Sequence, residues 1–384
     1  MLRPGPSVMR PSLRITTMPG GPHPLVRLPR VTTWDPAPFR DQVQQVLDAF
    51  LDERAAELAA LGPDATRLIT EARTSVTGGK RFRAAFCHWG HRAIRPEVTD
   101  PDALARACAS LELLHASALV HDDYMDASDT RRGRPATHRA FEAEHRAAGW
   151  RGDPQQFGAA AAILLGDLLL GWSGDLLRRS GFDAGAVATG LALFELCRTE
   201  VIAGQFLDVS VQARGRADVD TAMTVLRYKS AKYSIERPLH IGAGLAGATP
   251  DQIERLTRFG LPLGEAFQLR DDLLGVFGDP AETGKPAGDD LVEGKRTVLV
   301  ALALDGAPPA AARRLDSALG TPLSTADVDE LREIIDDSGA RAQVEAVIGQ
   351  LAEHAVEALR AADLDAQAVV VLTELAAAAT QRTV

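Results

Sequence analysis

Aromatic residues and strand-like patterns are scarce in this sequence. Phenylalanine, tryptophan and tyrosine make up 5% of the 384 residues, although 46% of all residues are hydrophobic, with alanine and leucine prominent among them. Alternation of β-branched residues, which is typical of strands, is rare, whereas apolar residues recur at helical spacing. We therefore expect an all-α protein, a helical bundle whose site lies between facing helices.

Cysteine and long apolar runs are also lacking. The three cysteines, Cys87, Cys108 and Cys197, are too few and too scattered for a disulfide framework or a zinc site, and they fit a reducing cytoplasm. No uninterrupted run reaches the ~20 apolar residues that a membrane-spanning helix needs. The stretch 159–170 is apolar but short, and Asp167 interrupts it. We therefore predict a cytoplasmic protein without a membrane span.

Positive charge is not abundant either. The formal net charge is −10 and no extended basic stripe exists, which argues against nucleic-acid binding. Residues 1–36 differ from the rest because they are rich in proline, glycine and arginine, and we expect them to be disordered. The motifs described below spread over most of the remaining chain. Residues 37–384 are therefore predicted to form one large helical domain with one site.

The first acidic motif is His-Asp-Asp-Tyr-Met-Asp at 121–126, which follows a largely apolar segment typical of a buried helix. Asp122 and Asp126 are four residues apart, so a helix projects them from one face. Carboxylates this close need a counter-charge, and Mg²⁺ supplies one while also binding substrate phosphates. Arg131 and Arg132 follow and can bind diphosphate oxygens. The alternative is a solvated acidic helix end with surface arginines as partners.

A second acidic motif repeats this arrangement. Apolar residues recur at helical spacing in 264–277, and Asp271 and Asp272 fall within this pattern. Glycines and a proline predict a loop downstream. That loop carries Lys285 and Lys295, which could close over a phosphate. The alternative is an ordinary charged surface loop.

A compact basic patch, Gly-Gly-Lys-Arg-Phe-Arg, occupies 78–83. Its glycines allow close backbone approach. Lys80 and Arg83 are three residues apart, so they would share a face if a helix begins here. The patch suits a second phosphate site. The alternative is a positively charged loop that binds no ligand.

Taken in order, the basic patch and the two acidic motifs resemble the trans-isoprenyl diphosphate synthases, or polyprenyl synthetases, most of all bacterial geranylgeranyl diphosphate synthases. The resemblance extends from about residue 78 to 297. It implies a bundle of the isoprenoid synthase type with a central apolar cavity. It also implies head-to-tail joining of isopentenyl diphosphate to an allylic diphosphate, three Mg²⁺ ions per site, and a homodimer.

The resemblance also assigns roles to individual residues. Asp122, Asp126 and Asp271 would bind the Mg²⁺ ions that hold the allylic diphosphate. Asp123 would belong to the catalytic set and Asp272 to the substrate-binding set. The allylic diphosphate would also be bound with the help of Arg131, Lys229, Lys285 and Lys295. The positions near the reacting carbon would be those of Gln268 and the Lys229-Ser230 pair. Isopentenyl diphosphate would be bound by Lys80, Arg83, His115 and Arg132.

Two positions depart from the family pattern. Gly275 stands where the second motif often has a third acid, so we expect weaker or altered metal binding rather than inactivity. Ser230 stands where threonine is frequent, and it keeps the hydroxyl. Gln205 and Asp208 match a helix segment that faces the cavity in the family, where they would order water or Lys229.

Product length is predicted from the helix that carries the first motif. Ser117 and Ala118 lie one turn before Asp122, and both are small. Aromatic residues at these positions stop chain growth early in the family, so small ones predict a product of C20 or longer. Leu113 and Leu114 are candidates for the floor of the cavity. Alternatively, another helix supplies the stop through one of three aromatic residues, Phe194, Phe206 or Trp172.

Three other functions compete with a geranylgeranyl diphosphate synthase. A longer-chain polyprenyl diphosphate synthase would share every motif. A class I terpene cyclase also has the first acidic motif, but it would carry a different second metal motif and would not need the basic patch. A non-catalytic partner subunit would be expected to lose first-motif aspartates, and this sequence keeps all three.

Overall fold

The computed structural model describes residues 34–215, 218–279 and 288–381, and these are almost entirely helical. The prediction of an all-α protein is confirmed. The first half contains α1 (Pro36–Leu58), the 3₁₀ turn η1 (Ala59–Leu61), α2 (Pro63–Val76), α3 (Phe82–Ile94), α4 (Pro101–Met125), strands β1 (Thr130–Arg131) and β2 (Arg134–Pro135), α5 (Thr137–Ala148), α6 (Pro154–Arg178) and α7 (Ala184–Arg214). The second half contains α8 (Val219–Val225), the π-helical segment η2 (Leu226–Glu236), α9 (Arg237–Leu245), α10 (Pro250–Phe277), α12 (Asp289–Val292), α13 (Val298–Gly306), α14 (Pro309–Ala318), α15 (Thr325–Asp337), α16 (Ala340–Ala361) and α17 (Ala366–Thr380).

Helix α4 carries the first acidic motif at its C-terminal end. Asp100 caps its first turn by accepting a hydrogen bond from the Ala103 amide, and Pro101 suits the first helical position because it needs no amide partner. The helix packs against α1, α3 and α6 and is buried along most of its length. Asp122 therefore lies in the last turn and Asp126 at the C-cap. The helix dipole disfavours negative charge there, so cations from other elements must compensate.

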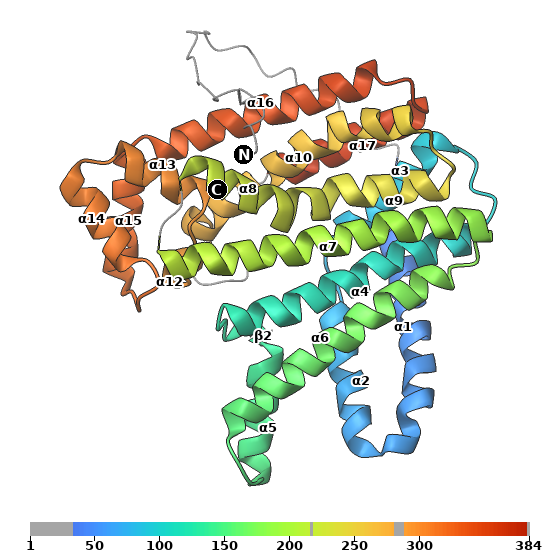
Figure 1. Cartoon of the computed structure of the whole chain (residues 1–384), viewed down its shortest axis with the longest axis horizontal. Coiled ribbons are helices and arrows are strands. Elements are labelled where there is room, and N and C mark those ends of the chain that lie inside the picture. The colour runs from blue at the N-terminus through green and yellow to red at the C-terminus, as the bar shows by residue number, and fades with distance from the viewer. Residues whose placement is uncertain (1–33, 216–217, 280–287, 382–384) are drawn as a thin grey trace, which may run out of the picture. The chain divides into compact units, whose positions relative to one another are not determined.

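Helix α10 carries the second acidic motif. A capping box of Thr249 and Gln252 fixes its start, with Pro250 at the first position. The helix packs against η2, α16 and α17, and in Figure 1 it runs in roughly the same direction as α4 and α7. Asp271 and Asp272 lie inside it, six and five residues before its last residue, Phe277. The expected helical setting of both acidic motifs is thus confirmed.

Between α8 and α9 the chain forms a π-helix rather than an α-helix. Such segments are rare and often occur at functional sites. The π-helix places Lys229 and Ser230 opposite α7, which approaches very closely at Gly204. A side-chain carbon at Gly204 would collide with the backbone of Lys229. Glycine is therefore needed here so that the polar residues of α7 can reach Lys229.

Three sequence expectations need correction or fall outside the described residues. Helix α3 begins at Phe82, so Lys80 precedes it and does not share a helical face with Arg83; Arg81 has a left-handed backbone, with φ of 56°, that marks the helix start. Most of the predicted disordered segment, residues 1–33, and Lys285 lie outside the described residues.

Two helices, α4 and α6, are long and apolar enough to cross a membrane by length and composition alone, although the sequence predicts no membrane span. In α4, 78% of the relevant window is buried inside the protein, and in α6 the share is 44%. Buried core helices meet the same criteria, so this is weak evidence for a membrane span. All three cysteines are buried and free.

Candidate active site

A cavity of 1280 Å³ lies among α3, α4, α7, η2 and α10. Most residues that the sequence singled out line it, although they come from segments far apart in the chain. Three of the predicted residues do not belong to the lining: Asp123, Asp126 and Leu113, which was a candidate for the cavity floor. The predicted residues that do line it are Lys80, Arg83, Leu114, His115, Ser117, Ala118, Asp122, Arg131, Arg132, Lys229, Ser230, Gln268, Asp271, Asp272 and Lys295.

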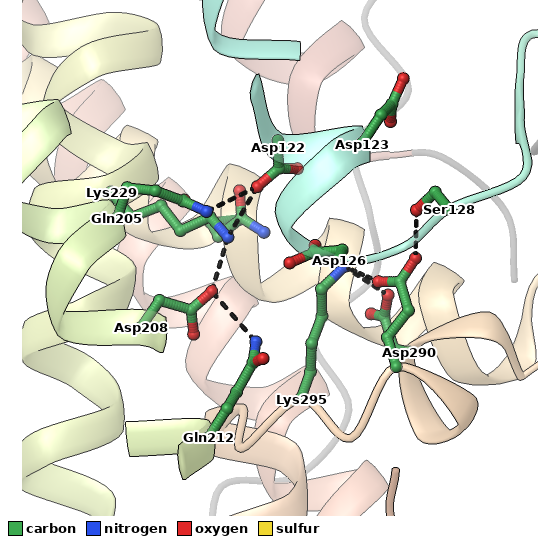
Figure 2. Close-up of polar contacts among 12 residues, drawn as sticks. Asp122, Asp123, Asp126, Ser128, Gln205, Asp208, Gln212, Lys229, Asp290 and Lys295 are labelled. Carbon is green, nitrogen blue, oxygen red and sulfur yellow. Dashed lines mark hydrogen bonds and ion pairs between the residues drawn. The ribbon is translucent and has the colours of Figure 1, made fainter. Parts of the chain in front are cut away.

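Asp122 is the centre of a polar network that joins α4, α7 and η2 (Figure 2). The Lys229 ammonium lies 3.3 Å from the Asp122 carboxylate and 2.6 Å from that of Asp208, and the Gln205 amide donates a 2.8 Å hydrogen bond to Asp122. Burial alone would raise the pKa of Asp122, but Lys229, Lys295 and Arg131 outweigh burial and hold the pKa at about 2. Asp122 is therefore a carboxylate at neutral pH. Of the two residues expected to order water or Lys229, Asp208 contacts Lys229, whereas Gln205 bonds to Asp122.

Lys295 is the cation of a second network, around Asp126 (Figure 2). Its ammonium lies 3.7 Å from the Asp126 carboxylate and 3.1 Å from that of Asp290, and it also pairs with Glu293. Glu293 in turn accepts a 2.8 Å hydrogen bond from the Ser128 hydroxyl. Burial and the nearby Asp122 raise the pKa of Asp126 to about 7 despite Lys295. The end of α4 thus carries clustered carboxyl groups, which favour the binding of an added cation.

Asp123 points away from the other two aspartates of the first motif (Figure 2). It is buried and pairs with the Arg131 guanidinium, whose Nε lies 2.8 Å away. Arg131 ends β1, and the β1–β2 hairpin turns through Arg132 and Gly133, both with positive φ, as a tight hairpin turn requires. Asp123 therefore positions Arg131 rather than facing the cavity itself.

The hairpin places Arg132 beside the basic patch. Its guanidinium donates a 2.9 Å hydrogen bond to the Thr77 carbonyl and lies against Gly79. Arg83 enters from the first turn of α3, where it donates a 2.8 Å hydrogen bond to the Ser234 hydroxyl and lies over the Tyr233 ring. The structure thus brings Lys80, Arg83 and Arg132 to one region of the cavity wall.

His115 lies beside this basic region and is uncharged. Its Nδ1 is 3.0 Å from the Tyr233 hydroxyl. Burial, followed by the positive charges of Arg83 and Arg132, lowers the pKa of His115 well below its ordinary value. The neutral imidazole can exchange hydrogen bonds with a diphosphate but cannot supply positive charge to it.

Arg81, the middle arginine of the basic patch, is part of the core. It is buried with Glu112, 2.8 Å away, and it also donates hydrogen bonds to Gln44 and to the Val76 carbonyl. Arg81→Met should lower the free energy of unfolding by about 3–5 kcal/mol, because it leaves the Glu112 charge buried and unpaired. Urea unfolding would measure the change. Adding Glu112→Leu should recover much of the loss, and a single-variant loss below about 1 kcal/mol would contradict the structural role.

The second acidic motif meets the first across the cavity. Asp271 and Asp272 both line it, and the Gln268 amide donates a 2.8 Å hydrogen bond to Asp272. Burial raises the pKa of Asp272 to about 7, and the neighbouring Asp290 and Asp271 add to the rise while Gln268 opposes it. Asp272 is thus a buried carboxyl held by Gln268, next to other negative groups.

Apolar side chains line the cavity along α4, α6 and α7. Ala118 and Leu114 lie on the α4 wall; Ser117 does so too, but its hydroxyl donates a 2.8 Å hydrogen bond to the Gly166 carbonyl of α6. Of the three aromatic candidates for a stop, Phe206 lines the cavity. Phe194 is buried in the core, and Trp172 packs against Phe50.

The residues present fit a magnesium site. Asp122 and Asp271 line one cavity with Asp126 next to them, and carboxylate oxygens are the donors that Mg²⁺ prefers. Within the described ranges no three His, Cys, Asp or Glu side chains are already grouped as a closed metal site. An open arrangement is what Mg²⁺ tolerates, since it takes one or two carboxylates and completes its shell with waters and phosphate oxygens.

Sequence reasoning missed three residues that the structure brings to the site. Tyr233 and Ser234 support His115 and Arg83, and the π-helix that positions them has no sequence signature. Asp290 joins Lys295 beside Gly275. In the sequence, Asp290 is marked only by its position in a short acidic run before a Gly-Lys pair. Its neighbours become visible only in the tertiary structure.

Known proteins resemble this chain in fold and in sequence. The polyprenyl synthetase family model matches residues 66–337. A short chain isoprenyl diphosphate synthase of Methanothermobacter thermautotrophicus is 32% identical over 81% of this chain and 90% of its own length. A geranylgeranyl diphosphate synthase of Mycobacterium tuberculosis is 34% identical over 61% of each chain. The solved geranylgeranyl pyrophosphate synthase of Corynebacterium glutamicum, complexed with isoprenyl diphosphate and magnesium, has 42% identity and a TM-score of 0.89, covering 91% of this chain and 100% of that one.

The fold and these relatives define the class as an all-α prenyltransferase. The chain belongs to the polyprenyl synthetase family, as its three motifs indicated. The names of the relatives differ in product, since farnesyl, geranylfarnesyl and nonaprenyl diphosphate synthases are also among them. The comparisons therefore establish the trans-prenyl diphosphate synthase family and leave the product length open.

Proposed function

We propose that this protein condenses isopentenyl diphosphate with an allylic diphosphate, head to tail, to make geranylgeranyl diphosphate. The allylic substrate would be dimethylallyl, geranyl or farnesyl diphosphate. The observation that carries the proposal is a single cavity that joins two aspartate-bearing helices, α4 and α10, to a cluster of cations and to an apolar wall. The related Corynebacterium glutamicum structure, which holds isoprenyl diphosphate and magnesium, supports it.

Asp122, Asp126 and Asp271 are the residues we assign to Mg²⁺ binding. They are hard oxygen donors, and the low pKa of Asp122 keeps that carboxylate charged. The family leads us to expect three ions per site. When bound, Mg²⁺ would neutralise the charge that develops on the departing allylic diphosphate.

The remaining steps depend on side chains of this chain. Lys229 and Arg131, already fixed by Asp122, Asp208 and Asp123, would bind the departing diphosphate without reorganising. Ser230 and Gln268 would lie near the reacting carbon. The apolar cavity would exclude water from the allylic cation, and the proton lost at the end would pass to the departing diphosphate.

The basic region around α3 would hold isopentenyl diphosphate through Lys80, Arg83, Arg132 and His115. Lys80→Ala should raise the KM for isopentenyl diphosphate about 10- to 100-fold, the loss expected for a hydrogen bond to a charged group. The KM for the allylic substrate should change much less. Steady-state kinetics would measure both, with Arg73→Ala on α2 as a surface control that leaves both unchanged. A larger effect on the KM for the allylic substrate would show that the two substrates are assigned to the wrong sites.

The C20 length is supported by the small residue at the cavity wall nearest the first motif. Ala118 leaves space one turn below Asp122, and Leu114 lies one turn further down the same helix. The relatives of known three-dimensional structure include several geranylgeranyl pyrophosphate synthases. A longer product remains the alternative, because relatives with longer products share the family.

A homodimer is part of the proposal. Helices α6 and α7 pack together, and both expose large apolar side chains that a single chain leaves uncovered. A two-fold interface through this face would bury them. Sedimentation should therefore give twice the mass of one chain, and a monomer at micromolar concentration would contradict it. The side chains concerned are Ile163 and Leu164 on α6 and Leu196, Ile202, Phe206 and Val209 on α7.

The reaction class can be tested by following diphosphate release. Purified protein with Mg²⁺ should release diphosphate only when isopentenyl diphosphate and an allylic diphosphate are both present. Release from the allylic substrate alone, with a cyclic hydrocarbon as product, would indicate a terpene cyclase instead. Turnover that appears only after a second protein is added would indicate a partner subunit.

A further inference from the structure

One face of α7 holds the π-helix η2 at both of its ends. Glu200, Gly204 and Asp208 lie four residues apart on α7, so all three face the same way. Asp208 pairs with Lys229 in the first part of η2 (Figure 2), and Gly204 lies against the backbone of the same lysine. Glu200 contacts the opposite end, where η2 passes into α9. The two ends of the π-helix are therefore held by a single helix.

Glu200 binds two cations at that end. Its carboxylate lies 2.9 Å from the Lys232 ammonium, and it accepts hydrogen bonds of 2.6 and 2.9 Å from Nε and Nη2 of Arg237. Burial alone would raise the pKa of Glu200, but the hydrogen bonds from Arg237 and Lys232 hold it below its ordinary value, so the carboxylate is charged at neutral pH. Glu236 lies farther from both cations, 3.8 Å from Lys232 and 4.0 Å from Arg237. Glu200 is thus their principal partner.

Arg237 is also fixed from its other side. Its Nη1 lies 3.0 Å from Nδ1 of His240, and Nε2 of the same imidazole lies 3.0 Å from the Thr257 hydroxyl on α10. Burial, followed by the charge of Arg237, lowers the pKa of His240 to about 3, so the imidazole is neutral and can accept a hydrogen bond from the arginine. Glu200, Lys232 and Arg237 do not line the cavity. The network therefore acts on the reaction through the residues that it holds.

The register of η2 decides which of its side chains face the cavity. In a π-helix each residue is hydrogen-bonded to the residue five positions away, whereas in an α-helix the interval is four. Most π-helical segments are single turns, but η2 extends over 11 residues, so tertiary contacts must maintain it. Relaxation to an α-helix would rotate Lys229 relative to Arg237 about the helix axis. The ion pairs of Glu200 oppose that rotation, because they bind the far end of η2 to the helix that also binds Lys229.

We propose that Glu200 is a positioning residue, which holds the π-helical register of η2 and so keeps Lys229 directed at the departing diphosphate. This inference rests on the proposed function for the role of Lys229. Glu200 would not contact either substrate, because it lies outside the cavity. Its effect on the reaction would pass through Lys229.

Hydrogen–deuterium exchange tests the hold on η2 without turnover. Glu200→Gln keeps the shape of the side chain but removes its charge. The amides of Leu226–Glu236 should then exchange at least about tenfold faster, the factor expected when a hydrogen bond to a charged group is lost, while those of α4 should be unaffected. Glu195→Gln is the matched control, because Glu195 lies on the same helix but pairs only with Arg198 near the surface, and exchange in η2 should be unchanged.

Kinetics of a double-mutant cycle test whether Glu200 acts through Lys229. Glu200→Gln alone should lower kcat about 10- to 100-fold at a temperature where the variant is folded, since misplacing a reacting group by about 1 Å can cost that much. In a Lys229→Ala background the same substitution should lower kcat by less than about threefold, because the group that it positions is already absent. A purely structural role would lower the melting temperature and leave kcat of the folded protein unchanged.

Two outcomes would overturn the proposal. Exchange in η2 that is as slow in Glu200→Gln as in the unchanged protein would show that Glu200 does not hold the register. An equal loss of kcat with and without Lys229 would show that Glu200 acts by another route. If Glu200→Gln does not fold, Lys232→Met decides, because it removes one of the two ion pairs, and unchanged exchange in η2 would then contradict the proposal. Failure of the unchanged protein to elongate an allylic substrate would count against the proposed function, while the exchange measurement would still test the hold on η2.

Discussion

Asp122→Asn should reduce kcat by at least about 10²–10³-fold, the loss typical of removing one group that stabilises transition-state charge. The substitution keeps the shape of the side chain but removes the charge that we assign to metal binding. It leaves Lys229 paired with Asp208. Asp271→Asn should have an effect of similar size from the opposite helix. Raising Mg²⁺ should recover part of either loss if metal binding is what is impaired.

Asp129→Asn is the matched control for these variants. Asp129 lies three residues after Asp126 but is exposed and pairs with Arg139 at 2.7 Å. Removing this charge should leave kcat within about twofold of the value for the unchanged protein, since exposed ion pairs contribute little to stability. Near-normal rates for Asp122→Asn or Asp271→Asn under limiting Mg²⁺ would show that the assigned carboxylates do not bind the metal. Initial rates at several Mg²⁺ concentrations provide the measurement.

Ala118→Phe should shorten the product to C15 or less. A phenyl ring at Ala118 would project from α4 into the cavity below Asp122 and would occupy the space that the growing chain enters. Ala118 is a better choice than Ser117, because the Ser117 hydroxyl contacts the Gly166 carbonyl and a large side chain there would press against α6. Chromatography of the products from isopentenyl and geranyl diphosphates would measure the length.

Ala118→Ser is the control for this substitution, because it hardly changes the volume and should leave the product length unchanged. An unaltered product from Ala118→Phe would mean that the stop lies elsewhere. Phe206 is then the first candidate, since it is the aromatic residue of α7 that lines the cavity. A longer product from a Phe206→Ala variant would confirm that Phe206 limits the product length.

The helical architecture and both acidic motifs could be predicted because their signals are local. The apolar run before Asp122 predicts a buried helix, and the spacing of Asp122 and Asp126 predicts a shared face. The Asp208–Lys229 contact was accessible only through the family resemblance, because more than twenty residues and a helix break separate the two. Local patterns thus located the site but did not describe its walls.

What could not be predicted depends on tertiary contacts or on unusual backbone. The π-helix that presents Lys229 and Tyr233 follows no sequence pattern. Arg81, whose left-handed backbone precedes α3, pairs with Glu112, which lies 31 residues further along the chain. Arg81 belongs to the basic patch that predicts a phosphate site, but its guanidinium is paired in the core. Asp290 lies beside Gly275 for the same kind of reason, since it comes from a segment that no spacing rule connects to α10.

The most direct test of the account is to follow labelled isopentenyl diphosphate into product. Purified protein would be incubated with Mg²⁺, labelled isopentenyl diphosphate and farnesyl diphosphate, and the products would be dephosphorylated and separated by chromatography. We predict that the label accumulates in a C20 prenyl alcohol, with one labelled unit added to each farnesyl chain. Label that stays in isopentenyl diphosphate while farnesyl diphosphate is consumed to a cyclic hydrocarbon would contradict the central claim.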